Sequence, residues 1–464
     1  MRTDTIAAVA TAMGNSGIGI IRVSGEDAIG IVDTIYKNKH NQGCLKTYGS
    51  NTIHYGFLYD GGELIDEVMV SVMKKPYSFT AEDTVEINCH GGILVMNRIL
   101  ELLIDNGARL AEPGEFSKRA FLNGRIDLTE AEAVMDLISS KNEMAFKNSL
   151  KQLRGEVYYS VVEFRKEIIH EIAFIESALD DPEHISIDGY STSLENKIND
   201  LIKKIEKLLS TAENGKMIRE GINTVIVGKP NAGKSSLLNS LTGEERAIVT
   251  DIAGTTRDVL EEDIRIGEIN LHIIDTAGIR STEDVIEKIG VEKAKKYAKE
   301  ADLIIYVVDS SVPLDKNDTE IIDMIEGKKC IILFNKSDLD SEISFDELKS
   351  KLRPELHEEL FMIRTSLKEN TGIDEFENAV RDLFLKGKIG NDNEIIITNI
   401  RHKEALKNAL ESLLMVKRSL QANMPEDFYS IDLMEAYSSL GKIIGEEIEE
   451  DLINEIFSSF CMGK

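Results

Sequence analysis

The sequence of 464 residues contains no tryptophan, only seven prolines and only four cysteines. The cysteines (Cys44, Cys89, Cys330 and Cys461) form no Cys-x-x-Cys pair, which argues against a zinc site and against a disulfide framework. No apolar run reaches the roughly 18 residues that a membrane span needs, and the first residues do not resemble a secretory signal. We therefore expect a cytoplasmic protein that does not enter the membrane.

Positive charge is also scarce. Lys and Arg number 54 against 82 Asp and Glu, which gives a formal net charge of −28. Such a chain repels polyanions on average, so contact with RNA would require a local basic patch such as Lys118-Arg119 or Arg401-His402-Lys403. The hydrophobic content of 42% excludes wholesale disorder. At roughly 100–200 residues per domain, the length predicts two to four domains.

Three sequence patterns follow one another along the chain. Residues 1–118 mix short β-like runs with turn signals and predict an α+β domain. Residues 119–220 and 386–464 show helical periodicity, whereas residues 221–385 alternate strand and helix signals in the manner of a parallel sheet buried on both faces. We therefore expect a multidomain α+β and α/β protein in which an α/β domain interrupts one helical domain.

Individual elements can also be predicted from these patterns. Strands are expected at 18–23, 67–73, 84–88, 224–227, 271–274, 303–308 and 330–334. Helices are expected at 161–179, 195–212 and about 444–460, and an apolar stripe with Leu406, Leu413 and Leu420 predicts another helix after about residue 398.

The strongest local signal is GKPNAGKS at 228–235, which fits the pattern G-x-x-x-x-G-K-[ST]. It follows an apolar strand-like run and precedes a helical one, as this phosphate-binding loop requires. Its backbone N–H groups would surround an anion, Lys234 would reach the β- and γ-phosphates, and the Ser235 hydroxyl would hold Mg²⁺.

Two further motifs follow in the order expected for a GTPase. Asp275-Thr276-Ala277-Gly278 ends a predicted strand, where a carboxylate can hold the Mg²⁺ shell and the glycine amide can face the γ-phosphate. Asn335-Lys336-Ser337-Asp338 ends the predicted strand at 330–334. The carboxylate of Asp338 can accept hydrogen bonds from guanine N1–H and N2–H, which adenine does not offer. The order of the three motifs predicts a protein that binds GTP in preference to ATP.

One position departs from Ras-like GTPases and affects the mechanism. The residue after D-x-x-G is Ile279, whereas a water-orienting glutamine stands there in Ras. Hydrolysis therefore needs another group to position water and another cation for the transition-state charge. Asn231, the loop 250–258 with its possible Mg²⁺ ligand Thr256, and the acidic residues around Glu287 are candidates. The alternative is that the acidic residues around Glu287 have no catalytic role and are solvent-exposed acids favoured by the dipole at a helix start.

These motifs together resemble the MnmE (TrmE) family of tRNA-modification GTPases from end to end. The resemblance is carried by GKPNAGKSSLLN, AIVTDIAGTTRD, DTAGIR and NKSD, with PGEFSKRAFLNGRIDL at 113–128 and FCMGK at 460–464. The GTPase motifs alone are shared with Era and Der. The segments 113–128 and 460–464 are therefore what distinguish the MnmE (TrmE) family from these other GTPases.

The resemblance implies a potassium-activated GTPase that modifies the wobble uridine of certain tRNAs at carbon 5 by a carboxymethylaminomethyl- or aminomethyl-type addition. It implies a folate, 5-formyltetrahydrofolate or a related compound, as the one-carbon source and Mg²⁺ and K⁺ as ions. It further implies an FAD-containing partner, MnmG (GidA), and a homodimer formed through the N-terminal domain that assembles with this partner into a heterotetramer.

The resemblance also assigns roles to residues. K⁺ would bind Asn231 and the backbone oxygens of Thr250, Ile252 and Thr255, where it would replace an arginine finger. Glu287 would position water. The residues expected to bind GTP are Asn231, Ala232, Gly233, Lys234, Ser235, Ser236, Thr250, Asp251, Ile252, Ala253, Gly254, Thr255, Thr256, Asp275, Thr276, Ala277, Gly278, Asn335, Lys336 and Asp338.

Outside the GTPase motifs, the resemblance assigns folate binding to Arg22, Glu86, Arg125 and Lys464. Cys461 matches a C-terminal cysteine that is a candidate for covalent or redox chemistry; the alternative is a buried cysteine at the end of the last helix. Two other functions remain open from the residues alone. One is a regulatory Era-like GTPase switch in ribosome assembly, and the other is a GTP-dependent dimerising scaffold.

Overall fold

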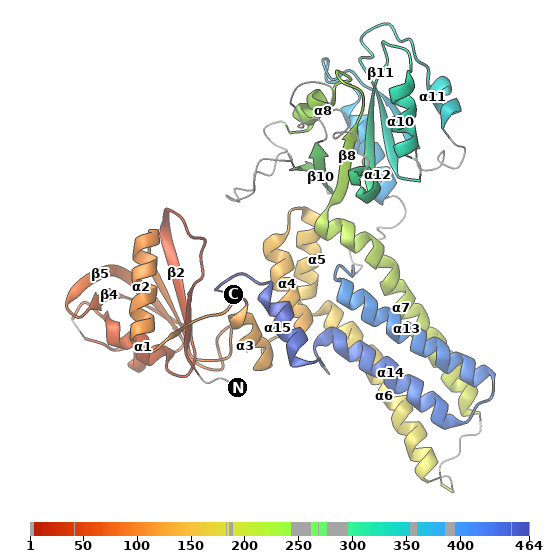
Figure 1. Cartoon of the computed structure of the whole chain (residues 1–464). Coiled ribbons are helices and arrows are strands. Elements are labelled where there is room, and N and C mark those ends of the chain that lie inside the picture. The colour runs from red at the N-terminus through yellow and green to blue at the C-terminus, as the bar shows by residue number, and fades with distance from the viewer. Residues whose placement is uncertain are drawn as a thin grey trace. The chain divides into compact units, whose positions relative to one another are not determined.

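The computed structural model describes residues 4–40, 42–181, 183–184, 189–242, 261–267, 269–275, 296–325, 327–352, 360–385, 395–446 and 448–463 (Figure 1). The chain divides into two compact units. Unit 1 contains residues 1–135, 152–194 and 411–464, and unit 2 contains residues 136–151 and 195–410. No described helix is long and apolar enough to cross a membrane.

Unit 1 contains a seven-stranded sheet of order β3-β4-β5-β6-β2-β1-β7. The strands are β1 (Ile6–Val9), β2 (Ser16–Ser24), β3 (Tyr36–Lys37), β4 (Thr52–Asp60), β5 (Glu63–Met73), β6 (Thr84–Gly91) and β7 (Arg109–Leu110). All neighbouring pairs are antiparallel except β1 and β7. The strands expected within β2, β5 and β6 are thus present, each longer than predicted.

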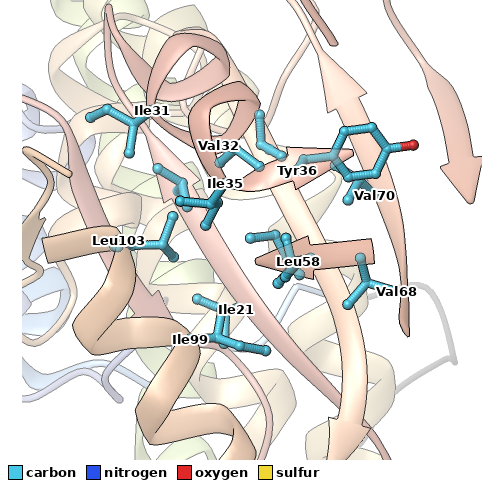
Figure 2. Close-up of a cluster of buried hydrophobic side chains, with 14 of the residues drawn as sticks. Ile21, Ile31, Val32, Ile35, Tyr36, Leu58, Val68, Val70, Ile99 and Leu103 are labelled. Atoms are coloured by element: carbon cyan, nitrogen blue, oxygen red, sulfur yellow. The ribbon is translucent and has the colours of Figure 1, made fainter. Parts of the chain in front are cut away.

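Helices α1 (Ala28–Ile35) and α2 (Ile93–Asp105) pack on one face of this sheet. Figure 2 shows the resulting core, in which side chains of both helices meet inward-facing strand residues; the labelled side chains are Ile21, Ile31, Val32, Ile35, Tyr36, Leu58, Val68, Val70, Ile99 and Leu103. Alternation along β2 buries Ile21 and Val23 in this core and leaves Arg22 on the opposite face of the sheet.

The rest of unit 1 is helical. It includes α3 (Glu115–Leu122), most of α4 (Leu128–Ser139), α6 (Glu156–Asp180), α14 (Glu426–Ile444) and α15 (Glu450–Ser458). Helix α6 packs along α14 and buries the expected stripe from Val161 to Ile175, but Leu179 at its end is 44% exposed. The last helix, expected at about 444–460, is present as α15 but is shorter than predicted. Gly445 adopts φ +95° and ends α14, so α15 begins only at Glu450.

Unit 2 contains a six-stranded sheet of order β13-β12-β11-β8-β10-β9. The strands are β8 (Ile222–Val227), β9 (Glu261–Ile266), β10 (Ile269–Asp275), β11 (Leu303–Asp309), β12 (Cys330–Asn335) and β13 (Leu360–Arg364). Neighbours are parallel except at β9. Every residue of β11 and β12 is buried, as expected for strands covered on both faces. The helices of this α/β part are α8 (Lys234–Leu241), α10 (Lys316–Met324), α11 (Phe345–Lys351) and α12 (Ile373–Leu385).

The helical segments before and after this α/β part contact each other within unit 2. These segments belong to α5 (Glu143–Leu153), α7 (Tyr190–Glu220) and the residues that lead into α13 (Ile400–Gln421). The side-chain amide of Asn148 donates to Ile396 O at 3.1 Å, and Ile397 N donates to Thr211 Oγ1 at 3.1 Å. These contacts support a helical domain with an inserted α/β domain, while the individual domain boundaries stay predictions.

Gly215 of α7 gives a test of the contact between α7 and the residues that lead into α13. A Cβ atom there would lie 1.9 Å from Ile397 O. Gly to Ala in a helix interior normally stabilises by about 1 kcal/mol, but overpacking costs about 1–3 kcal/mol. We expect Gly215→Ala to lower the free energy of unfolding, measured by denaturant titration. The control is Gly30→Ala in α1, where the nearest atoms are 3.6 Å away; this change should be neutral or stabilising. A stabilising Gly215→Ala would show that the contact is not maintained.

Candidate functional site

The loop 228–235 joins β8 to α8 and requires glycine at both of its glycine positions. Gly228 has φ +155° and a Cβ there would lie 2.4 Å from Val307 O. Gly233 has φ +111° and a Cβ there would lie 2.2 Å from the side-chain nitrogen of Asn335. The backbone of the loop therefore lies too close to Val307 O and to the Asn335 side chain for any residue with a Cβ at these two positions. Asn231 also adopts a left-handed conformation, with φ +61°, and its side chain is exposed.

The loop presents positive charge and amide donors at one place. Lys234 Nζ donates to Gly228 O at 2.7 Å and to Lys229 O at 2.8 Å, so its ammonium group lies across the loop. Helix α8 starts at Lys234, and Ser235 and Ser236 lie in its first turn. The first amides of a helix have no intrahelical acceptor and carry the positive end of the helix dipole. This arrangement can bind phosphate, and the Ser235 hydroxyl can reach a cation beside it.

The predicted base-binding motif is connected directly to this loop. The Asn335 side chain donates to Ala232 O at 2.8 Å and accepts from Leu367 N at 3.2 Å. Asp338 is exposed, and its Oδ1 accepts a hydrogen bond of 2.8 Å from Ser366 Oγ. That bond lowers the pKa of Asp338 below its usual value, so the carboxylate is ionised at neutral pH and can accept two N–H groups of guanine.

Lys336 lies between these two residues and is fixed by Asp309 at the end of β11. Burial acts to raise the pKa of Asp309, but the bonds from Lys336 and Ser311 outweigh it, and the pKa is lowered. The side chain of Lys336 is thus held by a charge rather than free to rotate. The motif also depends on the Ser366-Leu367 segment, whose Ser366 Oγ and Leu367 N donate to Asp338 and Asn335.

Part of the expected site lies outside the described residues. Asp275 ends β10, but its side chain is not described. The other residues concerned, all outside the described part of the chain, are Thr250, Asp251, Ile252, Ala253, Gly254, Thr255, Thr256, Thr276, Ala277, Gly278, Ile279, Glu287 and Lys464.

A second cluster of predicted residues lies on the sheet of unit 1. Arg22 and Glu86 are cross-strand partners on β2 and β6, with Nε–Oε1 and Nη2–Oε1 distances of 2.8 and 2.7 Å. The guanidinium carbon also lies 5.8 and 5.6 Å from the ring centres of Phe79 and Phe116. A half-buried cation, a carboxylate and two aromatic rings are therefore combined at one site.

The C-terminal segment reaches this cluster. Arg22 Nη1 donates to Gly463 O at 3.1 Å. Gly463 has φ +83°, and a Cβ there would lie 2.4 Å from Val9 O, so the segment runs closely against β1. Cys461 is exposed, and its carbonyl accepts from Gly114 N at 3.4 Å. The exposed Arg125 is not brought to the pair: among described residues, no hydrogen bond or ion pair joins it to Arg22 or Glu86.

The expectation that Lys118-Arg119 forms a basic surface patch is wrong. Arg119 is buried and binds carboxylates of Asp4, Glu82 and Glu115. Glu115 precedes it by one helical turn, which places both side chains on the inward face of α3. The second patch is also interrupted, because His402 is fully buried. Sequence reasoning missed the role of this carboxylate network, although the spacing of Glu115 and Arg119 was visible.

Comparisons with known proteins cover both units. A family model described as MnmE helical domain matches residues 128–461, and one described as GTP-binding protein TrmE N-terminus matches residues 5–125. The tRNA modification GTPase MnmE of Lachnoclostridium phytofermentans is 53% identical over 464 residues, with both chains completely covered. The MnmE of Acetivibrio thermocellus is 48% identical over 465 residues, again with both chains completely covered. The chain belongs to the MnmE family of tRNA modification GTPases.

Membership of the MnmE family makes the chain a GTP hydrolase that acts in tRNA modification, with Mg²⁺ as the ion that such GTPases use. The G domain of the FeoB iron transporter of T. maritima is 25% identical, with 35% of this chain and 98% of that chain covered and a TM-score of 0.27. Aquifex aeolicus Era bound to GDP and AlF4- is 28% identical, with 42% and 67% covered and a TM-score of 0.28. These scores are too low to add to the family assignment.

Asp338→Asn tests guanine recognition in this MnmE-family chain. The change removes the charge that accepts two N–H groups, and a hydrogen bond to a charged group contributes about 1.5–3 kcal/mol. We expect GTP to bind about 10- to 100-fold more weakly by titration calorimetry. Asp340→Asn changes a nearby exposed carboxylate and should leave the affinity unchanged. If Asp338→Asn retains both GTP affinity and preference for GTP over ATP, the assignment of this motif is wrong.

Proposed function

We propose that this GTPase is activated by K⁺ and, with an FAD-containing partner of the MnmG (GidA) type, modifies the wobble uridine of certain tRNAs at carbon 5. A folate such as 5-formyltetrahydrofolate supplies the one-carbon unit for the carboxymethylaminomethyl- or aminomethyl-type addition. The observation that carries this proposal is the Arg22–Glu86 pair with the C-terminal segment bound to it. A nucleotide switch alone gives no reason for such a site in the same chain.

The proposed K⁺ site rests on Asn231. This residue lies in the phosphate loop, is exposed and adopts φ +61°. Its side-chain oxygen is a suitable ligand for a cation beside the phosphates, together with backbone oxygens of Thr250, Ile252 and Thr255. A positive charge there stabilises the charge that develops on the transferred phosphoryl group, as an arginine finger does in other GTPases. Ser235 and Thr256 are the proposed Mg²⁺ ligands, and Glu287 is the proposed group that positions water.

The proposed folate site rests on complementary chemistry around Arg22. Its guanidinium can donate to a carboxylate or carbonyl, Glu86 can accept N–H groups of a pterin ring, and Phe79 and Phe116 give an apolar wall. Arg125 and Lys464 are the other proposed folate contacts. Cys461 is exposed two residues before Gly463, which is consistent with its proposed covalent or redox role.

The proposed homodimer has a candidate surface on unit 1. On the sheet face away from α1 and α2, Ile53, Tyr55 and Met69 are 62%, 48% and 51% exposed. Tyr55 and Met69 are direct cross-strand partners, so these side chains are contiguous. An apolar sheet face of this kind is typical of an interface. We propose that a second copy covers it and that the dimer assembles with the partner into a heterotetramer.

The proposed reaction requires coupling between the two units, because hydrolysis of GTP cannot by itself add a group to a base. The nucleotide site belongs to unit 2 and the proposed folate site to unit 1. We propose that closure of the G domains around GTP is transmitted through the helical segments 119–220 and 386–464. Both segments belong in part to each unit, which supports this role.

GTP hydrolysis in matched KCl and NaCl tests the cation mechanism. A charge at the arginine-finger position is worth about 10³–10⁵ in rate, so we expect at least tenfold stimulation by K⁺ and its loss in Asn231→Ala. Asn239→Ala, an exposed asparagine on α8, is the matched control and should keep the stimulation. Equal rates in both salts would refute K⁺ activation and return the Era-like switch as the better alternative.

Folate binding tests the one-carbon part of the proposal. Arg22→Ala removes a charge-assisted contact, so the full chain should bind 5-formyltetrahydrofolate about 10- to 100-fold more weakly by calorimetry. Arg98→Ala removes an exposed arginine on α2 of the same unit and should have no effect. Wild-type affinity in Arg22→Ala would remove the main support for folate chemistry at this site.

A further inference from the structure

Lys229, the second residue of the phosphate loop, forms ion pairs with two acidic residues at the start of helix α10. Its Nζ lies 2.8 Å from Asp318 Oδ2 and 3.3 Å from Asp315 Oδ2, and its side chain is only 13% exposed. Asp318 is almost fully buried and also accepts a 2.7 Å hydrogen bond from Tyr306 Oη. Burial acts to lower the pKa of Lys229, but the bonds to Asp318 and Asp315 outweigh it and raise the pKa, so the side chain stays a cation.

The acidic residues are themselves fixed by the fold. Asp315 is the N-cap of α10 and accepts from Asn317 N and Asp318 N, while Asp318 accepts from Asp315 N. Tyr306 lies on β11 and is the register partner of Val227, the last residue of β8. The network therefore joins the start of α10 and the adjacent strand β11 to Lys229, the second residue after β8. Figure 1 shows α10 beside β11.

The main chain of Lys229 belongs to the phosphate-binding arrangement. Its carbonyl accepts from Lys234 Nζ at 2.8 Å and from Ala232 N at 3.3 Å. The preceding residue, Gly228, is packed against Val307 O. A rotation of the peptide groups at Lys229 would therefore move the loop amides and the Lys234 ammonium group together.

We propose that Lys229 is a positioning residue for GTP binding, which fixes the phosphate loop through its ion pairs with Asp318 and Asp315 of α10. This inference rests on the assignment of 228–235 as the phosphate loop. The side chain of Lys229 is directed to α10, so the proposed effect on the nucleotide acts through the main chain of the loop. The same connection gives α10 a direct route to the phosphate site.

An electrostatic role and a positioning role of this network predict opposite effects of an Asp318 substitution on phosphate binding. The two roles can therefore be distinguished by experiment. If the network acted only through its electric field, removal of the Lys229 cation would weaken binding of anionic phosphates, and removal of the Asp318 anion would strengthen it. If the network positions the loop, both changes weaken phosphate binding. A general loss of folding would weaken binding of the base as well.

The experiment measures affinities for GDP and for guanosine, which lacks phosphates, with Lys229→Met, Asp318→Asn and the double variant of the full chain. We expect both single variants to bind GDP about tenfold more weakly, the double variant to be no worse than the singles, and guanosine affinity to be unchanged. For hydrolysis, KM should rise while kcat stays within about twofold, because bound GTP itself organises the loop. Lys229→Arg keeps the positive charge and should bind GDP with the affinity of the wild-type chain.

Lys316→Met is the matched control, since Lys316 is an exposed lysine on the same helix and two residues from Asp318. It should leave GDP affinity unchanged. Tighter GDP binding in Asp318→Asn would overturn the inference in favour of a field effect, and unchanged GDP affinity in Lys229→Met would overturn it outright. Parallel loss of guanosine affinity would also overturn it, by showing a purely structural role. If the wild-type chain binds GDP no better than guanosine, the phosphate-loop assignment itself fails.

Discussion

The side-chain amide of Asn335 is the contact on which the nucleotide site depends. It is buried, donates to Ala232 O and accepts from Leu367 N, and so joins the phosphate loop to the 335–338 motif and to the Ser366-Leu367 segment. Because its nitrogen would lie 2.2 Å from a Cβ of residue 233, it also explains why Gly233 cannot be another residue. A buried amide that lost one of these partners would cost about 1–3 kcal/mol. One side chain therefore connects the candidate phosphate loop to the candidate base-binding segments.

A similar arrangement stabilises the cluster around Arg22 in unit 1. Gly463 packs its backbone against Val9 O, and Arg22 binds the carbonyl of Gly463. The arginine is oriented from the other side by Glu86, its partner across the sheet. In both units a glycine permits a close approach, and a buried or half-buried polar side chain then connects segments distant in sequence. The local motif is necessary in each case, but the geometry comes from the tertiary contact.

This explains how far the sequence could predict the fold and the site. The buried strands of unit 2 and the phosphate loop were predictable because their signals are local: continuous apolar runs, and glycines at fixed spacing. β4 was missed because its central Gly56 weakens a strand signal; the glycine is needed because a Cβ would lie 2.3 Å from the Tyr36 ring. β9 was missed because its EEDIRI sequence is too charged for the apolar-run pattern.

The candidate sites show the same limit. The sequence assigned Arg22 and Glu86 to one site through a resemblance, and only the sheet register makes them partners. It placed Lys118-Arg119 on the surface, whereas Arg119 is inside a carboxylate network. Sequence spacing shows which residues share a helix face, but not whether that face is covered.

The internal use of basic residues bears on how an acidic chain could act on RNA. Arg119, Arg22 and Lys229 are all bound to carboxylates of the chain itself, so these cations do not contribute to an exposed basic surface. With a net charge of −28, the chain as a whole repels phosphates, and this repulsion increases as salt is lowered. A protein of this kind binds a tRNA most readily when another surface supplies the positive charge. The participation of a second protein, as proposed above, is therefore consistent with the electrostatics of this chain.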